Sequence, residues 1–228
     1  MVLNGMEQQR KTNRFKLLAI GLVLGVTASV ATVLVMANQA NKANASAMPD
    51  ACNSRAFAEI GGPFSLVNQD NVAVTDRTLL GKPAFIYFGF TYCPDICPMS
   101  LQTMSLALEE AKIAEGRKID DIQPILISID PERDTPASLK TYVTSNGFPE
   151  QLMGLTGSVQ QVTIAAKAFK VAFRKSIPEG SPAKDYVMDH TSIFYLLGRD
   201  GKLRTFFSGD PDPKQMGQCI AALSKSGL

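Results

Sequence analysis

The sequence predicts an α/β domain with a central mixed sheet flanked by helices, and three observations support this prediction. Residues 84–90 form an apolar and aromatic run of the length and type of a buried central strand. An amphipathic helix follows, and residues 122–129 form a second, near-continuous apolar strand. Strand, helix and strand in this order make a right-handed parallel unit. Residues 193–197 and 203–207 flank an Arg-Asp-Gly turn, so they predict an antiparallel hairpin in the same domain.

The composition is that of an ordinary globular protein, with 45% apolar and 19% charged residues in a chain of 228. The charge is unevenly distributed: residues 1–47 carry five basic residues and one acidic residue, whereas residues 48–228 carry 18 basic and 20 acidic. A large domain this close to neutral has no electrostatic footprint for nucleic acid. We therefore expect no nucleic-acid partner.

Residues 17–37 carry no charge and predict one N-terminal transmembrane helix. At 1.5 Å per residue this run reaches about 30 Å, the thickness of the bilayer hydrocarbon. Four basic residues in the segment 1–16 keep the N-terminus in the cytoplasm. A cleavable signal peptide has a shorter apolar core, roughly 7–15 residues. We therefore favour a retained anchor, although the small residues at 43–47 would also suit cleavage.

The membrane is expected to be a bacterial inner membrane, with the large domain on the periplasmic side. An Arg- and Ser-rich transit peptide would precede the span in a mitochondrial protein, and residues 1–16 do not have that composition. The small and polar residues of 38–55 predict a linker, which leaves 56–228 as the folded domain.

The domain begins with a predicted hairpin, because residues 64–67 and 72–75 flank the polar turn 68–71. Thr135 and Pro136 then predict the N-cap and first position of a helix that ends near Asn146-Gly147.

Ser158 and Gln161 predict a capping box for the next helix. The remaining expected elements are a strand at 171–176, a loop at 177–185, a strand at 186–189 and a last helix at 213–224. The order of all these elements is thioredoxin-like.

The segment that carries chemistry is Cys93-Pro-Asp-Ile-Cys97-Pro98, between the central strand and its helix. Proteins of the α/β class bind ligands at this edge of the sheet. The four-residue spacing predicts that both thiols lie within about one helical turn, on the same side. Unpaired amides and the dipole at a helix N-terminus favour thiolate and lower the thiol pKa. Thiolate both binds metals and attacks disulfides.

His190 is the single histidine of the chain and the candidate third ligand. We expect it at the start of a hairpin strand, near the cysteines. Two thiolates and one imidazole suit Cu(I) and can also hold Cu(II), whereas zinc in a closed structural site requires a fourth ligand. Asp189 could support the imidazole unless strand alternation points it away.

Other interpretations of these residues stay open. A lone histidine usually has another role, and Cys93 and Cys97 could form a plain redox dithiol, although the thioredoxin motif has two residues between its cysteines rather than three. Met99 and Met104 could add thioether ligands, but methionine on a helix is more often core filler.

Cys52 and Cys219 lie near the two ends of the domain. They could pair with each other, or they could be a tether thiol and a buried core thiol.

Three blocks in this order resemble the Sco/SenC family, membrane-anchored copper proteins of cytochrome c oxidase assembly. They are Phe88-Gly-Phe-Thr-Tyr-Cys93-Pro-Asp-Ile-Cys97-Pro98, Ser128-Ile-Asp-Pro-Glu-Arg-Asp-Thr-Pro136 and Asp189-His190-Thr-Ser192. The resemblance covers residues 57–225 and implies a thioredoxin-like domain that binds one copper ion through Cys93, Cys97 and His190. Cys52 and Cys219 are outside the family pattern, and the turn 68–71 lacks the glycine expected there.

The resemblance also implies a partner, cytochrome c oxidase subunit II. Copper, as Cu(I) or Cu(II), would be delivered to its binuclear copper site. We therefore expect a metallochaperone rather than an enzyme. The alternative is a thiol–disulfide oxidoreductase whose Cys93 and Cys97 reduce the copper-site cysteines of that subunit. Further expected partners are periplasmic copper chaperones and thioredoxin-like reductases.

Overall fold

The chain divides into two compact units, residues 1–47 and 48–228. The computed structural model describes the following residues: 32–33, 35–36, 52, 59–115, 119, 121–177, 179–180, 182, 185–225 and 228.

The predicted transmembrane span at 17–37 lies outside the described residues, apart from 32–33 and 35–36, which are helical. Of the predicted linker at 38–55, only Cys52 is described. Among the described helices, none combines the length and the apolar character needed to cross a membrane.

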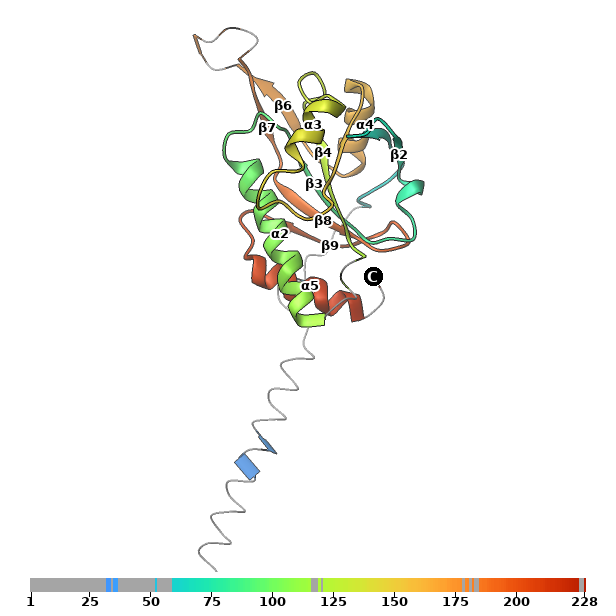
Figure 1. The fold of residues 1–228 in the computed structure, drawn as a ribbon, viewed down its shortest axis with the longest axis vertical. Helices are drawn as coiled ribbons and strands as arrows, with labels where there is room; N and C mark the ends of the chain where they lie inside the picture. Colours follow the sequence, from blue (N-terminus) through green and yellow to red (C-terminus); the bar gives the residue numbers. More distant parts are fainter. Residues whose placement is uncertain are drawn as a thin grey trace, which may run out of the picture. The chain divides into compact units, whose positions relative to one another are not determined.

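The second unit is built on a seven-stranded mixed sheet (Figure 1). Its strands are β1 (Ser65–Asn68), β2 (Ala73–Thr75), β3 (Ala84–Gly89), β4 (Gln123–Ser128), β5 (Met153–Thr156), β8 (Ile193–Leu197) and β9 (Leu203–Ser208). They are ordered β2-β1-β5-β4-β3-β8-β9. The β3–β4 and β4–β5 pairs are parallel, and the pairs toward both edges are antiparallel. Two further strands, β6 (Phe173–Ser176) and β7 (Val187–His190), form a separate antiparallel sheet.

Within its described residues, this unit also contains four α-helices and the short 3-10 helix η2 (Arg77–Leu79). The α-helices are α2 (Ile96–Glu115), α3 (Pro136–Tyr142), α4 (Val159–Ala168) and α5 (Pro213–Lys225). The N-caps of α3 and α4 are confirmed: the Thr135 hydroxyl accepts from the Ser138 amide, and Ser158 and Gln161 form the capping box. Helices α2 and α5 pack against each other (Figure 1), at a point where a Cβ on Gly217 would lie 2.5 Å from the Cβ of Glu110.

Strand β3 is buried along its whole length, which places it at the centre of the core. Its side chains alternate between the two faces. On one face the Tyr87 ring lies 4.9 Å from that of Phe194, and on the other the Phe88 ring lies 5.4 Å from that of Phe169, at the end of α4. The expected mixed sheet with helices on both faces is confirmed.

The structure differs from the sequence-based elements at three places. Strand β5 was not predicted, because its four residues include Gly154 and show no alternation. Helix α3 ends at Tyr142, before the predicted Asn146-Gly147, since β-branched and short polar residues follow it. His190 is the last residue of β7, so it does not begin the hairpin strand, which starts at Ile193.

The first hairpin is confirmed in spite of its unusual turn. Asn71 adopts the left-handed conformation (φ 60°) in which a glycine would be expected. The Asn68 side chain accepts hydrogen bonds from the amides of Asp70 and Val72, which closes the turn without a glycine.

Candidate metal centre

Cys93 and Cys97 lie where β3 leads into α2. The helix begins at Ile96, so Cys97 is in its first turn and Cys93 precedes it, which corrects the expectation that one helical turn carries both. Pro98 is in the first turn, where a proline is tolerated. The Cys97 amide donates to the Cys93 Sγ over 3.3 Å, so the two thiols lie together. Cys93 is half-buried and Cys97 is completely buried; both are unbridged.

The two thiols differ in acidity. A hydrogen bond from the Cys97 thiol lowers the pKa of Cys93 to about 6, and the backbone amides of Asp95, Ile96 and Cys97 act in the same direction against its partial burial. The same hydrogen bond raises the pKa of Cys97, and burial raises it further. Cys93 is therefore a thiolate at neutral pH, as the position at a helix N-terminus predicts.

The imidazole of His190 reaches the thiols from the separate β6–β7 sheet. Its Nε2 lies 3.6 Å from the Cys97 Sγ, and its Nδ1 lies 3.0 Å from the carbonyl oxygen of Thr191. A carbonyl only accepts hydrogen bonds, so Nδ1 carries the proton of that bond. Burial lowers the pKa of His190, which favours the neutral ring. The lone pair of Nε2 therefore faces the Cys97 thiol, as in a histidine that ligates a metal.

Asp189 takes no part in orienting this ring. Its side chain is half exposed and accepts a hydrogen bond from Arg174 over 3.0 Å. It therefore points away from the thiols, as strand alternation predicts. The carbonyl of Thr191 holds Nδ1 instead. A backbone acceptor leaves no signal in the sequence, so this partner could not be predicted.

Aromatic side chains and one glycine pack around the imidazole and the Cys97 sulfur. The rings of Tyr87 and Phe90 each lie 6.1 Å from that of His190, edge to face. A Cβ on Gly89 would come within 3.0 Å of the Cys97 Sγ and of the Tyr87 ring. Because Gly89 has no side chain, the sulfur of Cys97 can lie close to its backbone.

A buried carboxylate fixes the loop that leads to Cys93. Asp134 is completely buried and accepts 2.6 Å hydrogen bonds from the hydroxyls of Thr91 and Ser128. The amide of Thr91 also donates to this carboxylate. In the sequence, the only signal of this contact is that Asp134 and Ser128 belong to the second of the three blocks.

The other sulfur-containing residues have separate places. Met104 is completely buried, which confirms that it fills the core. Met99 is 57% exposed, so the expectation that it fills the core was wrong. Cys52 and Cys219 form a disulfide, with their Cα atoms 5.3 Å apart. Within the described residues, no three His, Cys, Asp or Glu side chains are already grouped as a metal site.

Comparison with known proteins places this arrangement in a family. A model of the family described as SCO1/SenC matches residues 53–225. The chain belongs to the SCO1/SenC family. One relative is the human "Protein SCO1 homolog, mitochondrial", which is 38% identical over 165 residues, 72% of this chain and 52% of that protein. The chain spans about half the length of the first curated relatives it matches.

Solved structures of Sco proteins have the same fold. Bradyrhizobium japonicum ScoI, solved with copper bound, is 40% identical, with a TM-score of 0.61 over 74% of this chain and 99% of that one. BsSco is 29% identical, with a TM-score of 0.56 over 76% of this chain and 97% of that one. It is described as having a disulfide switch and as a member of the Sco family of cytochrome c oxidase assembly proteins. The predicted thioredoxin-like fold and the family are thereby confirmed.

Proposed function

We propose that this chain is a copper-binding protein of cytochrome c oxidase assembly. Cys93, Cys97 and His190 would hold one copper ion, which is cargo to be passed on rather than a resident cofactor. We propose cytochrome c oxidase subunit II, at its binuclear copper site, as the recipient. The bound ion would be Cu(I) or Cu(II).

The observation that carries this proposal is the approach of the His190 Nε2 to the Cys97 Sγ, 3.6 Å apart, with the proton of the ring held on Nδ1. An imidazole that served only to fill the core would not need a free lone pair directed at a buried thiol. One imidazole and two soft sulfur donors match the preference of copper. The copper in a related ScoI structure supports the same choice of metal.

Transfer by ligand exchange suits the unequal exposure of the two thiols. Cys93 is half-buried and its pKa is lowered to about 6, so its sulfur can leave the ion as a thiolate when a partner's thiolate takes its place. Cys97 is completely buried and, together with His190, would keep the ion during the exchange.

The second candidate function is thiol–disulfide exchange, which the acidity of Cys93 favours. The Cys93 thiolate would attack a partner disulfide and form a mixed disulfide, releasing one partner thiolate. Cys97, after losing its proton, would attack the Cys93 sulfur and release the second partner thiolate. The partner is reduced by two electrons, and the protein is left with a Cys93–Cys97 disulfide. Reduction of the copper-site cysteines of subunit II is the corresponding role.

For the location, we propose that residues 17–37 anchor the chain in a bacterial inner membrane. Residues 1–16 would lie in the cytoplasm, 38–55 would be the linker, and the domain 56–228 would lie in the periplasm. The charge asymmetry of the flanks supports this orientation.

Replacement of His190 by Ala separates the two functions. The copper proposal predicts that the full-length His190→Ala chain loses tight copper retention and fails to support oxidase assembly, while its Cys93–Cys97 pair still reduces a model disulfide. Copper retention at the level of the unmodified chain would contradict the ligand assignment. Loss of disulfide reduction would show that the histidine also serves the thiol chemistry.

A further inference from the structure

The three proposed ligands come from two parts of the fold that share no sheet. Cys93 and Cys97 follow β3 of the large sheet, whereas His190 ends β7 of the two-stranded sheet. Within the described residues, neither β6 nor β7 is hydrogen-bonded to the large sheet. His190 lies three residues before β8, which pairs with β3, so this short chain connection and side-chain contacts together set the distance between the thiols and the imidazole.

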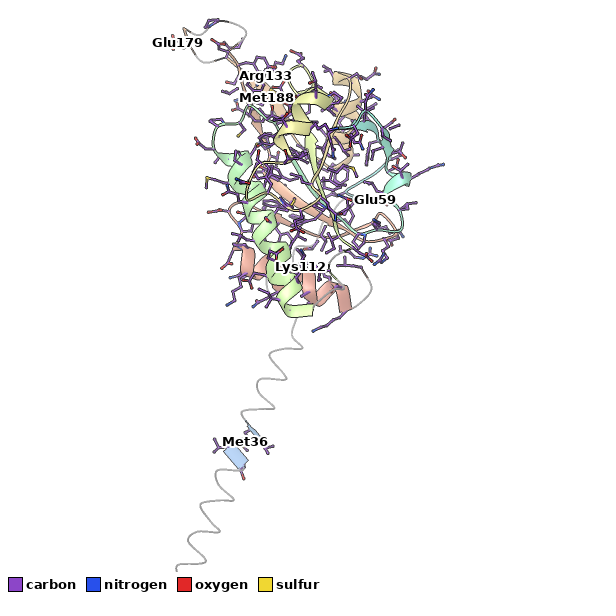
Figure 2. The ribbon with its side chains drawn as sticks, in the orientation of Figure 1. Met36, Glu59, Lys112, Arg133, Glu179 and Met188 are labelled. Atoms are coloured by element: carbon purple, nitrogen blue, oxygen red, sulfur yellow. A yellow bond between two sulfur atoms is a disulfide. The ribbon has the colours of Figure 1, made fainter. Side chains whose placement is uncertain are left out.

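Arg133 lies between these two parts, in the loop that follows β4. The centre of its guanidinium lies 3.8 Å from the Tyr186 ring and 4.7 Å from the Tyr92 ring. Tyr92 immediately precedes Cys93, and Tyr186 immediately precedes β7. Figure 2 shows Arg133 at the end of the domain that also carries Met188 of β7. One cation thus contacts both ligand-bearing segments.

Arg133 makes more contacts with Tyr186 than with Tyr92. Arg133 Nη1 donates to the Tyr186 carbonyl over 3.0 Å, and the Tyr186 hydroxyl donates to Asp130 over 2.6 Å. Asp130 is buried and also accepts from Arg133 Nε. Burial and this carboxylate raise the pKa of Tyr186 to about 12, so its hydroxyl stays a donor. The ring, carbonyl and hydroxyl of Tyr186 are all held by the loop after β4.

Within the described part of the chain, Arg133 contacts Tyr92 by stacking of its guanidinium on the ring. The Tyr92 side chain is 63% exposed, so packing within the core does not fix it. A guanidinium above an aromatic ring is attracted to the ring electrostatically, and more strongly where water is excluded. Among the described residues, Arg133 Nη2 is buried without a hydrogen-bond partner. An unpaired buried donor is unfavourable, so the guanidinium keeps its position between the two rings at the expense of one hydrogen bond.

We propose that Arg133 is a positioning residue of the copper site, which clamps Tyr92 and Tyr186 and thereby keeps the segments that carry the thiols and His190 close together. Arg133 does not touch the metal. This inference rests on the proposed function, because the distance that Arg133 sets matters only if the thiols and the imidazole bind one ion. Its structural half, the clamp itself, can be tested without copper.

The chain offers matched variants for this test. Arg133→Met keeps the aliphatic stem and removes the charge, and Arg133→Lys keeps the charge but cannot hold Asp130 and the Tyr186 carbonyl together. Tyr92→Leu removes one side of the clamp at an exposed position. Arg174→Met is the control: it removes a cation from β6 whose ion pair with Asp189 is exposed and is expected to contribute little.

The copper-free measurement uses the ring signals of the only histidine in the chain. In the reduced full-length chain, nuclear Overhauser effects should connect the His190 ring with the Tyr87 and Phe90 rings, which are 6.1 Å away by centroid. We expect the two Arg133 variants and Tyr92→Leu to lose or weaken these effects, and Arg174→Met to keep them. Effects of normal strength in folded Arg133→Lys and Tyr92→Leu chains would overturn the clamp, even if Arg133→Met failed to fold.

The copper measurement is electron paramagnetic resonance of the Cu(II)-loaded full-length chain. The unmodified chain and Arg174→Met should show nitrogen coupling from one imidazole. The Arg133 variants should lose this nitrogen coupling and bind copper about tenfold more weakly. Residues that orient metal ligands without touching the metal typically change affinity about 10–100-fold, and we expect the lower end of that range. Unchanged coupling would overturn the proposal, and so would an equal loss in Arg174→Met. If the unmodified chain showed no nitrogen coupling, the proposed function would fail, and the ring measurement would decide the clamp alone.

Discussion

A methyl group at Gly89 tests whether packing sets the position of Cys97. Gly89 has no positive φ, so Gly89→Ala introduces no backbone strain. Its Cβ would lie 3.0 Å from the Cys97 Sγ, 3.0 Å from the Tyr87 ring and 3.3 Å from Leu126. Nonbonded heavy atoms prefer roughly 3.5–4.0 Å, so at least one neighbour must move.

The expected magnitude follows from two opposing effects. Overpacking in a buried site costs about 1–3 kcal/mol, and exchange of glycine for alanine in a strand returns about 0.5–1 kcal/mol. The two ranges combine to a fall of about 0–2.5 kcal/mol in the free energy of unfolding, and we expect a value near the middle, about 1 kcal/mol. Because the Cys97 Sγ is the crowded atom nearest His190, copper affinity should fall about tenfold as well, as for other contacts that orient a ligand.

Gly154→Ala is the matched control, because its Cβ would lie 3.0 Å from Val143 and 3.3 Å from Leu139, away from the thiols. Urea unfolding measures stability, and competition with a Cu(I) chelator measures affinity. The two variants should lose similar stability, but only Gly89→Ala should lose affinity. Full copper affinity in Gly89→Ala would refute the idea that the space at Gly89 positions the sulfur of Cys97.

Three further predictions concern the disulfide, the thiols and the buried carboxylate. The Cys52–Cys219 bridge joins residues 167 positions apart, so its removal should lower the free energy of unfolding by about 3–5 kcal/mol. An unchanged urea midpoint in Cys52→Ser would contradict this. Alkylation of the reduced chain should begin at Cys93 and accelerate as pH rises through about 6, because the thiolate forms there, while Cys97 stays slow; peptide mapping at several pH values checks it. Asp134→Ala should cost about 2–4 kcal/mol, since it leaves buried donors unpaired, and a loss below 1 kcal/mol in urea unfolding would count against that hydrogen-bonded role.

The order of elements could be predicted because local signals coincide with the fold. The apolar run of β3, the capping box of α4 and the proline that begins α3 depend on nearby residues alone. Strand β5 could not be predicted, because four residues around Gly154 become a strand only by pairing with β4 and β1.

The site was predictable in its residue types but not in its geometry. Cysteine spacing beside a strand marks a functional pair, and a single histidine leaves little choice of a nitrogen ligand. That His190 ends a separate small sheet, and that Arg133 contacts both segments, depends on contacts between residues far apart in sequence. The Cys52–Cys219 pairing likewise joins the two ends of the domain, and no local pattern indicates it.

The most direct test of the copper site is the copper content and absorption spectrum of the reduced full-length chain, beside Cys97→Ser and His190→Ala. We predict one copper ion per chain and a thiolate-to-Cu(II) charge-transfer band that both substitutions abolish. Absence of tight copper in the unmodified chain, together with a readily cycling Cys93–Cys97 disulfide, would contradict the proposal and identify a thiol–disulfide reductase.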